Sequence, residues 1–588
     1  MRRVLSALGV GAFGALPLLS PPKIFPPLVA YLLTDGRDLV FASALLGAAS
    51  VLLAPASWPR LLADAQRRLE SASESRFFWT AFGVGLLIAF ASIPAWRSNA
   101  TVFGGDEPKY LRMADSLARD LDVDVASTSQ LPPSLSGSWS NARRLVRSAG
   151  DAAAGLFAVA TIPEGHTWSR GNWTIAGAHG GHYYVQSPGL PMLLFPATLA
   201  QAILFPDRPD VFLPLATLAL LLGFGFAQTL LLASALAGDR ISGLLVTALA
   251  FGCAPLLIGG FHFYPESAAM ALVPWILRHG LADRPASGPS SFALGVAIGF
   301  LPWLHPKYLL LAAVLAALLS QRLRASRRLT AAAAGALPLV TGLLLYDHRV
   351  TGLFTPDALY RRFGSEIYQG PASFLRAKLL NGLVTAFFGA RDGIFVMAPW
   401  LAGGALAALA ALRRDSRRAQ ALLAVVTSVA IAAAAHEGGA PGPPGRLMAP
   451  VAPALAGLLA IGFPVLRRSI GFGLTIALFA WVSFSITLGM YDDQRRTVNP
   501  YRDVFSDAAH DFARDLPDGP GRRPASLALH KSRDLARGAL LFGGLLFWAW
   551  CFGRGGAERA PARAAITWLV CLWCSIAATG WGLTALGP

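Results

Sequence analysis

Apolar and polar positions along this chain are grouped in long blocks. Apolar stretches of about 17–22 residues recur, enough for a helix to cross the roughly 30 Å hydrocarbon core of a bilayer. They are continuous and rich in Leu and Ala, so they predict helices and not the alternating strands of a membrane barrel. The predicted spans are 4–20, 38–56, 77–97, 211–236, 241–258, 265–280, 291–302, 304–320, 330–346, 394–412, 419–435, 447–466, 470–490, 538–553 and 564–583.

Three apolar segments are expected to behave differently from an ordinary span. Segment 188–204 opens with a Ser-Pro-Gly turn and carries two further prolines, which favours a re-entrant or interfacial placement. Segment 291–302 is short and broken by prolines, so it is the weakest span. Segment 373–389 has an amphipathic pattern and is expected to lie along the bilayer surface.

The short basic loops predict the orientation of the spans. If every predicted helix crosses the bilayer, these loops all fall on one side, as the positive-inside rule requires. They are 60–76, 238–240, 321–328, 413–418, 467–468 and 554–563. The long polar segments then lie outside the cytoplasm, and these are 98–187, 347–393, 436–446 and 491–537.

Composition supports an all-α polytopic membrane protein. Apolar residues make up 54% of the 588 residues and charged residues only 14%, where a soluble chain carries about a quarter. The net charge of +17 would suit a nucleic-acid binder, but the arginines lie in short loops between spans. No soluble basic domain is left to hold a nucleic acid, so that class is excluded.

Two adjacent carboxylates open the first long outer loop. Asp106 and Glu107 follow a pair of glycines and precede Pro108, which suits the first turn of a helix running to about Arg119. One interpretation is that a carboxylate caps this helix. The other is that it takes a proton from an acceptor hydroxyl, or binds the acceptor or a metal.

Further ionisable residues gather on the same predicted side. Each one taken alone is explained by solvation at the end of a span. Together they suit a phosphate-linked substrate, because cations neutralise phosphate while a carboxylate serves the nucleophile. The candidate substrate-binding residues of this group are His182, Glu266, His305, Lys307, Arg391, His436, Glu437 and Arg446.

The motif that begins at Asp106 and runs through Leu111 resembles the acidic first-loop motif of GT-C superfamily glycosyltransferases. This superfamily includes the protein O-mannosyltransferases and the lipid A aminoarabinose transferases. Segment 184–191, which ends in Pro-Gly-Leu-Pro, is similar to the segment that closes the first loop in many bacterial members. The resemblance covers roughly 77–490. It also includes the Gly-Asp-Arg turn at 238–240, the Tyr-Pro-Glu pattern at 264–266 and the Gly-Arg-Leu pattern at 445–447.

The resemblance implies a GT-C-like helical bundle with a large first extracytoplasmic loop, 98–187. It implies a polyprenyl-phosphate sugar as donor and a site on the outer side of the cytoplasmic membrane. Asp106 and Glu107 would bind the acceptor or act as base, with Tyr110 beside them. Arg446, with Lys307 or Arg391, would hold the carrier phosphate. Metal dependence differs across the superfamily, so the acidic pair implies no particular ion; the sugar and the acceptor stay open.

The expected organisation has four parts: extra N-terminal helices and a linker (1–76), the catalytic core (77–490), an outer loop (491–537) and C-terminal helices (538–588). The alternative function is a secondary transporter or lipid flippase. That class predicts charges at mid-span and broken helices in matched halves. The charges here lie at span ends, which favours the transferase, and an assembly protein without catalysis of its own stays open.

Overall fold

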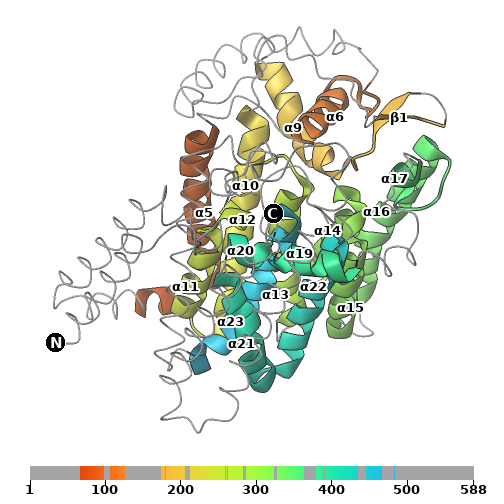
Figure 1. Ribbon diagram of the computed structural model, residues 1–588. Helices are drawn as coiled ribbons and strands as arrows, with labels where there is room; N and C mark the ends of the chain where they lie inside the picture. The colour runs from red at the N-terminus through yellow and green to blue at the C-terminus, as the bar shows by residue number, and fades with distance from the viewer. Residues whose placement is uncertain are drawn as a thin grey trace, which may run out of the picture.

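The computed structural model of the chain is mostly helical (Figure 1). Five predicted spans, at 4–20, 38–56, 470–490, 538–553 and 564–583, lie outside the described residues or almost entirely so, as do segments 491–537 and 538–588. The residues described are 67–97, 106–125, 174–178, 181–205, 212–257, 260, 262–282, 287–323, 327–362, 379–388, 393–398, 400–434, 445–466 and 483.

The α-helices follow the apolar blocks of the sequence. They are α5 (Glu74–Arg97), α6 (Glu107–Asp120), α9 (Gly189–Leu204), α10 (Phe212–Ala237), α11 (Arg240–Phe251), α12 (Ala254–Leu257), α13 (Pro265–Leu281), α14 (Gly288–Leu304), α15 (Leu309–Leu323), α16 (Arg327–Thr351), α17 (Ala358–Arg362), α19 (Leu379–Phe388), α20 (Ile394–Met397), α21 (Trp400–Arg414), α22 (Ser416–Ala434) and α23 (Ala452–Leu466). Two 3₁₀ helices, η3 (Pro306–Tyr308) and η5 (Arg446–Val451), precede α15 and α23.

Five helical segments of the described chain are long and apolar enough to cross a bilayer. They are Phe212–Ala237, Pro306–Leu323, Arg327–Thr351, Ser416–Ala434 and Arg446–Pro464. The prediction of a helical membrane protein is therefore confirmed. The GT-C-like arrangement and the large first loop remain predictions.

Helix α10 lies at the centre of the bundle and α16 at its edge. In the most apolar window of each helix, 72% of the residues of α10 are buried but only 17% of those of α16. Helix α10 packs against α5, α11, α13 and α23, whereas the main partner of α16 is α14. A helix that is apolar all round suits both positions, because hydrocarbon replaces protein on the exposed side of α16.

Three of the basic loops predicted to share one side, 60–76, 238–240 and 413–418, meet at one end of the bundle in the described part of the chain. Arg240, which opens α11, donates to the carbonyls of Leu69 and Ala72. Arg414 at the end of α21 donates to the Ile461 carbonyl at 2.9 Å, and Arg418 donates to the Leu281 carbonyl. Cations that bind carbonyls near helix C-termini also interact favourably with the negative end of the helix dipole. The arrangement of these three loops agrees with the prediction from the charge pattern that they share one side.

Several expected elements differ in detail. The spans predicted at 241–258 and 394–412 are each split, into α11 with α12 and α20 with α21. The helix predicted at 291–302 is found but is longer, because α14 begins at Gly288 and continues through Pro302 to Leu304. The all-α prediction misses a two-stranded antiparallel hairpin of β1 (Thr174–Ala176) and β2 (His182–Tyr184). Its branched and aromatic residues favour strands.

Candidate functional site

Helix α6 begins as the sequence predicts, but Asp106 does not cap it. Asp106 occupies the N-cap position and Pro108 lies in the first turn, yet the Asp106 side chain makes no capping hydrogen bond. Its Oδ1 instead accepts hydrogen bonds from Lys109 Nζ at 2.8 Å and Gln186 Nε2 at 2.9 Å. The capping interpretation is therefore wrong, and the carboxylate is directed at groups outside the helix backbone.

Glu107 points into the protein. Its side chain is 1% exposed, against 26% for Asp106. Glu107 Oε1 accepts a hydrogen bond from the Phe263 backbone N–H at 3.0 Å and lies 3.1 Å from His262 Nδ1. Adjacent helical positions point in different directions, so two neighbouring carboxylates have separate environments. Glu107 thereby ties α6 to the segment before α13.

The Pro-Gly-Leu-Pro turn brings a second element to Asp106. Helix α9 begins at Gly189, and a Cβ added there would overlap the backbone of Trp303 and Leu304 at the end of α14. Only glycine allows the two backbones to approach so closely. This contact places Gln186, three residues earlier, against Asp106.

The His-Pro-Lys sequence at 305–307 interrupts the helical run between α14 and α15 and places the Lys307 side chain inside the protein. Lys307, in η3, forms an ion pair with Glu266 in the first turn of α13. The two side chains are 5% and 1% exposed. A buried ion of this kind is costly unless paired, so each partner requires the other.

His305 links this pair to α17. Its Nδ1 accepts a hydrogen bond from the Lys307 backbone N–H at 3.1 Å. Nδ1 is then unprotonated, and the neutral imidazole carries its proton on Nε2, which lies 2.8 Å from Tyr360 Oη. His305 therefore donates to Tyr360 and holds the backbone of Lys307.

Arg446 completes the cluster from η5. Gly445 before it has φ +73°, a conformation that favours glycine. The Arg446 guanidinium lies over the Tyr264 ring, 3.9 Å from its centroid. It interacts electrostatically with Glu266, Asp106 and Tyr110. The Tyr264 side chain in turn has a hydrogen bond to the backbone of Asp106.

Four buried polar atoms in this cluster have no hydrogen-bond partner among the described residues: Gln186 Oε1, Glu266 Oε2, Tyr308 Oη and Arg446 Nε. Three of them belong to Glu266, Tyr308 and Arg446. Glu266 and Arg446 both interact electrostatically with Tyr308, so the three groups are neighbours. A buried polar group without a partner costs free energy, and such groups gather where a ligand supplies the missing bonds. Burial also raises the pKa of Tyr110 well above its ordinary value, which keeps its hydroxyl protonated.

The residues proposed from sequence fall into three groups. Those that the structure brings together are Asp106, Glu107, Tyr110, Glu266, His305, Lys307 and Arg446. His182 lies in β2 with an exposed side chain, and its backbone pairs with Asp124 and Val125. It is therefore part of the hairpin and not of the cluster. Arg391, His436 and Glu437 lie outside the described residues.

Sequence reasoning missed several members of the cluster. Gln186 and Tyr264 belong to recognised patterns, so their neighbours could have suggested them. Tyr360 stands in a polar segment without a motif, and only the fold places it against His305. Among the described residues, no group of three His, Cys, Asp or Glu side chains is arranged to hold a metal ion.

Comparisons with known proteins give little further information. No family model matches the chain, and no curated protein matches it. Among solved structures it is similar to the crystal structure of ArnT from Cupriavidus metallidurans bound to undecaprenyl phosphate, with 12% identity and a TM-score of 0.37. That alignment covers 86% of this chain and 77% of the other. Similarity at this level establishes neither a common fold nor a common activity, so the functional interpretation depends on the site itself.

Proposed function

We propose that the chain is a glycosyltransferase that moves a sugar from a polyprenyl-phosphate carrier to an acceptor hydroxyl on the outer side of the cytoplasmic membrane. One observation carries the proposal: the partly exposed carboxylate of Asp106 shares a cluster with the buried cations Lys307 and Arg446. Transfer from a sugar phosphate needs both a base for the hydroxyl and a cation for the leaving phosphate.

The reaction is a single displacement at the anomeric carbon. The acceptor oxygen bonds to that carbon while the bond from the carbon to the phosphate oxygen breaks. The acceptor proton passes to Asp106, and the electron pair leaves with the carrier phosphate, which gains one negative charge. Both described side-chain bonds to Asp106 use Oδ1, so Oδ2 is the oxygen offered to the acceptor.

Lys307 and Arg446 stabilise the leaving phosphate in this scheme. Arg446 Nε has no hydrogen-bond partner among the described residues, and Lys307 is held by Glu266. Charge that develops beside preorganised cations in a buried site is stabilised more than in water. The Glu107 carboxylate is not accessible to an acceptor, because it is buried against Phe263 and His262. We assign it the role of positioning α6.

The experiment measures the polyprenyl phosphate released by the purified full chain in nanodiscs. A panel of polyprenyl-phosphate sugars is supplied with crude envelope acceptors, and wild type is compared with Asp106→Asn and Arg446→Gln. The matched control is Asp415→Asn, a carboxylate paired with Arg418 at the opposite end of the bundle. Release from one donor, lost in the two site variants and kept in the control, supports the transferase.

Two results would contradict the proposal, one in full and one in part. If no donor is consumed and reconstituted vesicles move a lipid or solute, the transporter alternative replaces the transferase. If release occurs but persists in Asp106→Asn, the reaction stands and the proposed base is wrong.

A further inference from the structure

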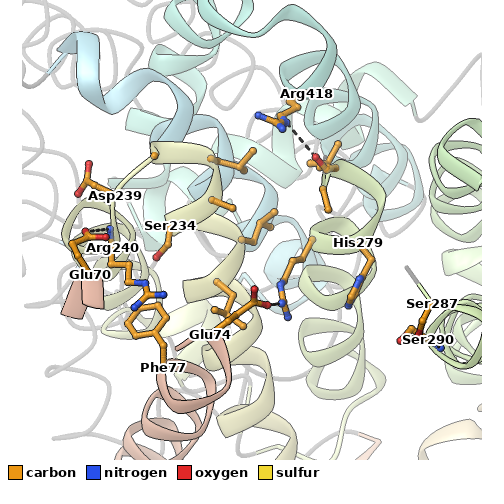
Figure 2. A pocket seen from close by; sticks show the side chains of 18 residues that line it. Glu70, Glu74, Phe77, Ser234, Asp239, Arg240, His279, Ser287, Ser290 and Arg418 are labelled. Atoms are coloured by element: carbon orange, nitrogen blue, oxygen red, sulfur yellow. Dashed lines mark hydrogen bonds and ion pairs between the residues drawn. The ribbon is translucent and has the colours of Figure 1, made fainter. Parts of the chain in front are cut away.

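A second polar site lies at the other end of the bundle, away from the cluster around Asp106. It is a cavity of about 560 Å³, within the range typical of small-ligand sites. It is lined by the start of α5, the end of α10, the start of α11 and the end of α13, with α14 and α22 at its edge. Figure 2 shows Asp239, Arg240 and Glu70 on one side and His279, Ser287 and Ser290 on the other.

The lining of this cavity carries both signs of charge in equal number. Its carboxylates are Glu70, Glu74 and Asp239, and its guanidinium groups are Arg240, Arg278 and Arg418. A ligand of one charge would meet repulsion from half of them. A ligand that carries an anion and a cation a few bonds apart would find a partner for each.

Most charged groups of the lining already have partners, but Glu70 and Glu74 are exposed and Arg240 and Arg278 are half-buried. The Glu74–Arg278 pair is partly exposed, with Glu74 at 66% and Arg278 at 21%. Glu70 Oε1 binds the backbone N–H of Arg240. The Arg240 guanidinium binds two backbone carbonyls and lies 4.6 Å from the Phe77 ring centroid, with no carboxylate neutralising it in the described contacts.

One wall of the cavity is apolar and belongs to spanning helices. Phe77 of α5, Leu231 and Leu232 of α10 and Leu281 of α13 line it. Helix α10 is one of the candidate spans, and the cavity lies at its end, where the basic loops gather. The cavity therefore combines polar groups and an apolar wall at the end of a span. This combination suits an amphiphile whose headgroup lies at the bilayer surface.

We propose that this cavity binds a zwitterionic phospholipid with a primary amine, of the phosphatidylethanolamine type. Arg240, Arg278 and His279 take the phosphate, and Glu70 and Glu74 take the ammonium. The glycerol backbone follows the apolar wall. This inference is independent of the glycosyltransferase proposal, because no residue of the cluster around Asp106 contributes to it.

The test is native mass spectrometry of the detergent-purified full chain with added lipids. Phosphatidylethanolamine is compared with phosphatidylglycerol, which has no amine, and phosphatidylcholine, whose amine cannot donate hydrogen bonds. We expect retention of phosphatidylethanolamine to exceed that of both. Glu74→Gln and Arg278→Gln should each lower it roughly three- to tenfold, since a hydrogen bond to a charged group is lost. Arg327→Gln, an exposed arginine that does not line the cavity, is the control.

Soluble glycerophosphoethanolamine distinguishes two sources of the headgroup. If it competes with the lipid, the headgroup alone is the ligand; if it does not, the membrane lipid is. Equal retention of all three lipids overturns the proposal, as does phosphatidylethanolamine binding that is the same in Glu74→Gln, Arg278→Gln and Arg327→Gln. Glu74→Gln keeps the shape of an exposed side chain, so its result does not depend on a fold-breaking change.

Discussion

Two carboxylates that are adjacent in sequence differ more in environment than their shared motif suggests. Asp106 is partly exposed and bound by side chains, while Glu107 is buried and bound by a backbone N–H. Burial decides which of them a substrate can reach. The roles proposed for them, base for Asp106 and anchor for Glu107, follow from this difference and predict different effects of substitution.

Asp106→Asn should abolish activity without unfolding the protein. Loss of a general base lowers turnover by about 10²–10⁴-fold, whereas the amide keeps the size of the side chain and its acceptor oxygen. The measurement is turnover of the polyprenyl-phosphate donor alongside the unfolding temperature. Full turnover in this variant would contradict the assignment.

Glu107→Ala should lower stability. It leaves the Phe263 N–H without its acceptor in a buried site, which costs about 1–3 kcal/mol. Thermal unfolding in detergent measures the loss, and Glu107→Gln, which retains an acceptor oxygen, should recover much of it. An unchanged unfolding temperature in Glu107→Ala would show that the carboxylate does not anchor α6.

His305 should act through Lys307. His305→Ala removes the acceptor of the Lys307 backbone N–H and the partner of Tyr360. We expect a raised KM for the polyprenyl-phosphate donor, because Lys307 is released from its position. His305→Asn places an amide oxygen near the former Nδ1 and should restore donor affinity. If Ala and Asn variants behave alike, the imidazole does not position Lys307.

At the scale of elements, the sequence predicts those features that local chemistry determines. The start of α6 at the Asp-Glu-Pro motif and the turn before Gly189 are local, and both are found. The breaks in α11–α12 and α20–α21 were missed although the sequence carries stop signals at both, Gly252 at the C-cap of α11 and Pro399 between α20 and α21. Tyr360 and His262 join the cluster only through tertiary packing, which no spacing reveals.

The contact between α9 and α14 should tolerate no side chain at position 189. Gly189→Ala introduces a methyl group into the backbone of Trp303 and Leu304, and overpacking of this kind costs about 1–3 kcal/mol. The control is Gly83→Ala in α5, where nothing lies within 4 Å of an added Cβ. That change should be neutral or stabilising by about 0.5–1 kcal/mol. Unfolding temperatures of the two variants measure the contrast, and equal values would contradict the close approach.

Across the whole molecule, the two ends of the bundle carry different groups. The basic loops meet at one end through Arg240, Arg414 and Arg418. The cluster around Asp106 and Lys307 lies among different helix ends, and Figure 1 shows α6, α9 and α17 away from α21. The positive-inside rule then predicts that the cluster lies outside the cytoplasm. Helix α16 offers a direct test, because its 25 residues span about 37 Å, more than the bilayer core.

Single cysteines at the two ends of α16 should therefore be accessible from opposite sides of the membrane. In a chain whose four native cysteines are replaced, Leu353→Cys and Arg327→Cys are both at exposed positions. A membrane-impermeant thiol reagent should label Leu353→Cys in cells with a permeable outer envelope and Arg327→Cys only in inside-out vesicles. Labelling in the reverse pattern would put the cluster on the cytoplasmic side, where a cytoplasmic donor would have to replace the outward-facing carrier. Labelling of both cysteines from one side would mean that α16 does not cross the membrane.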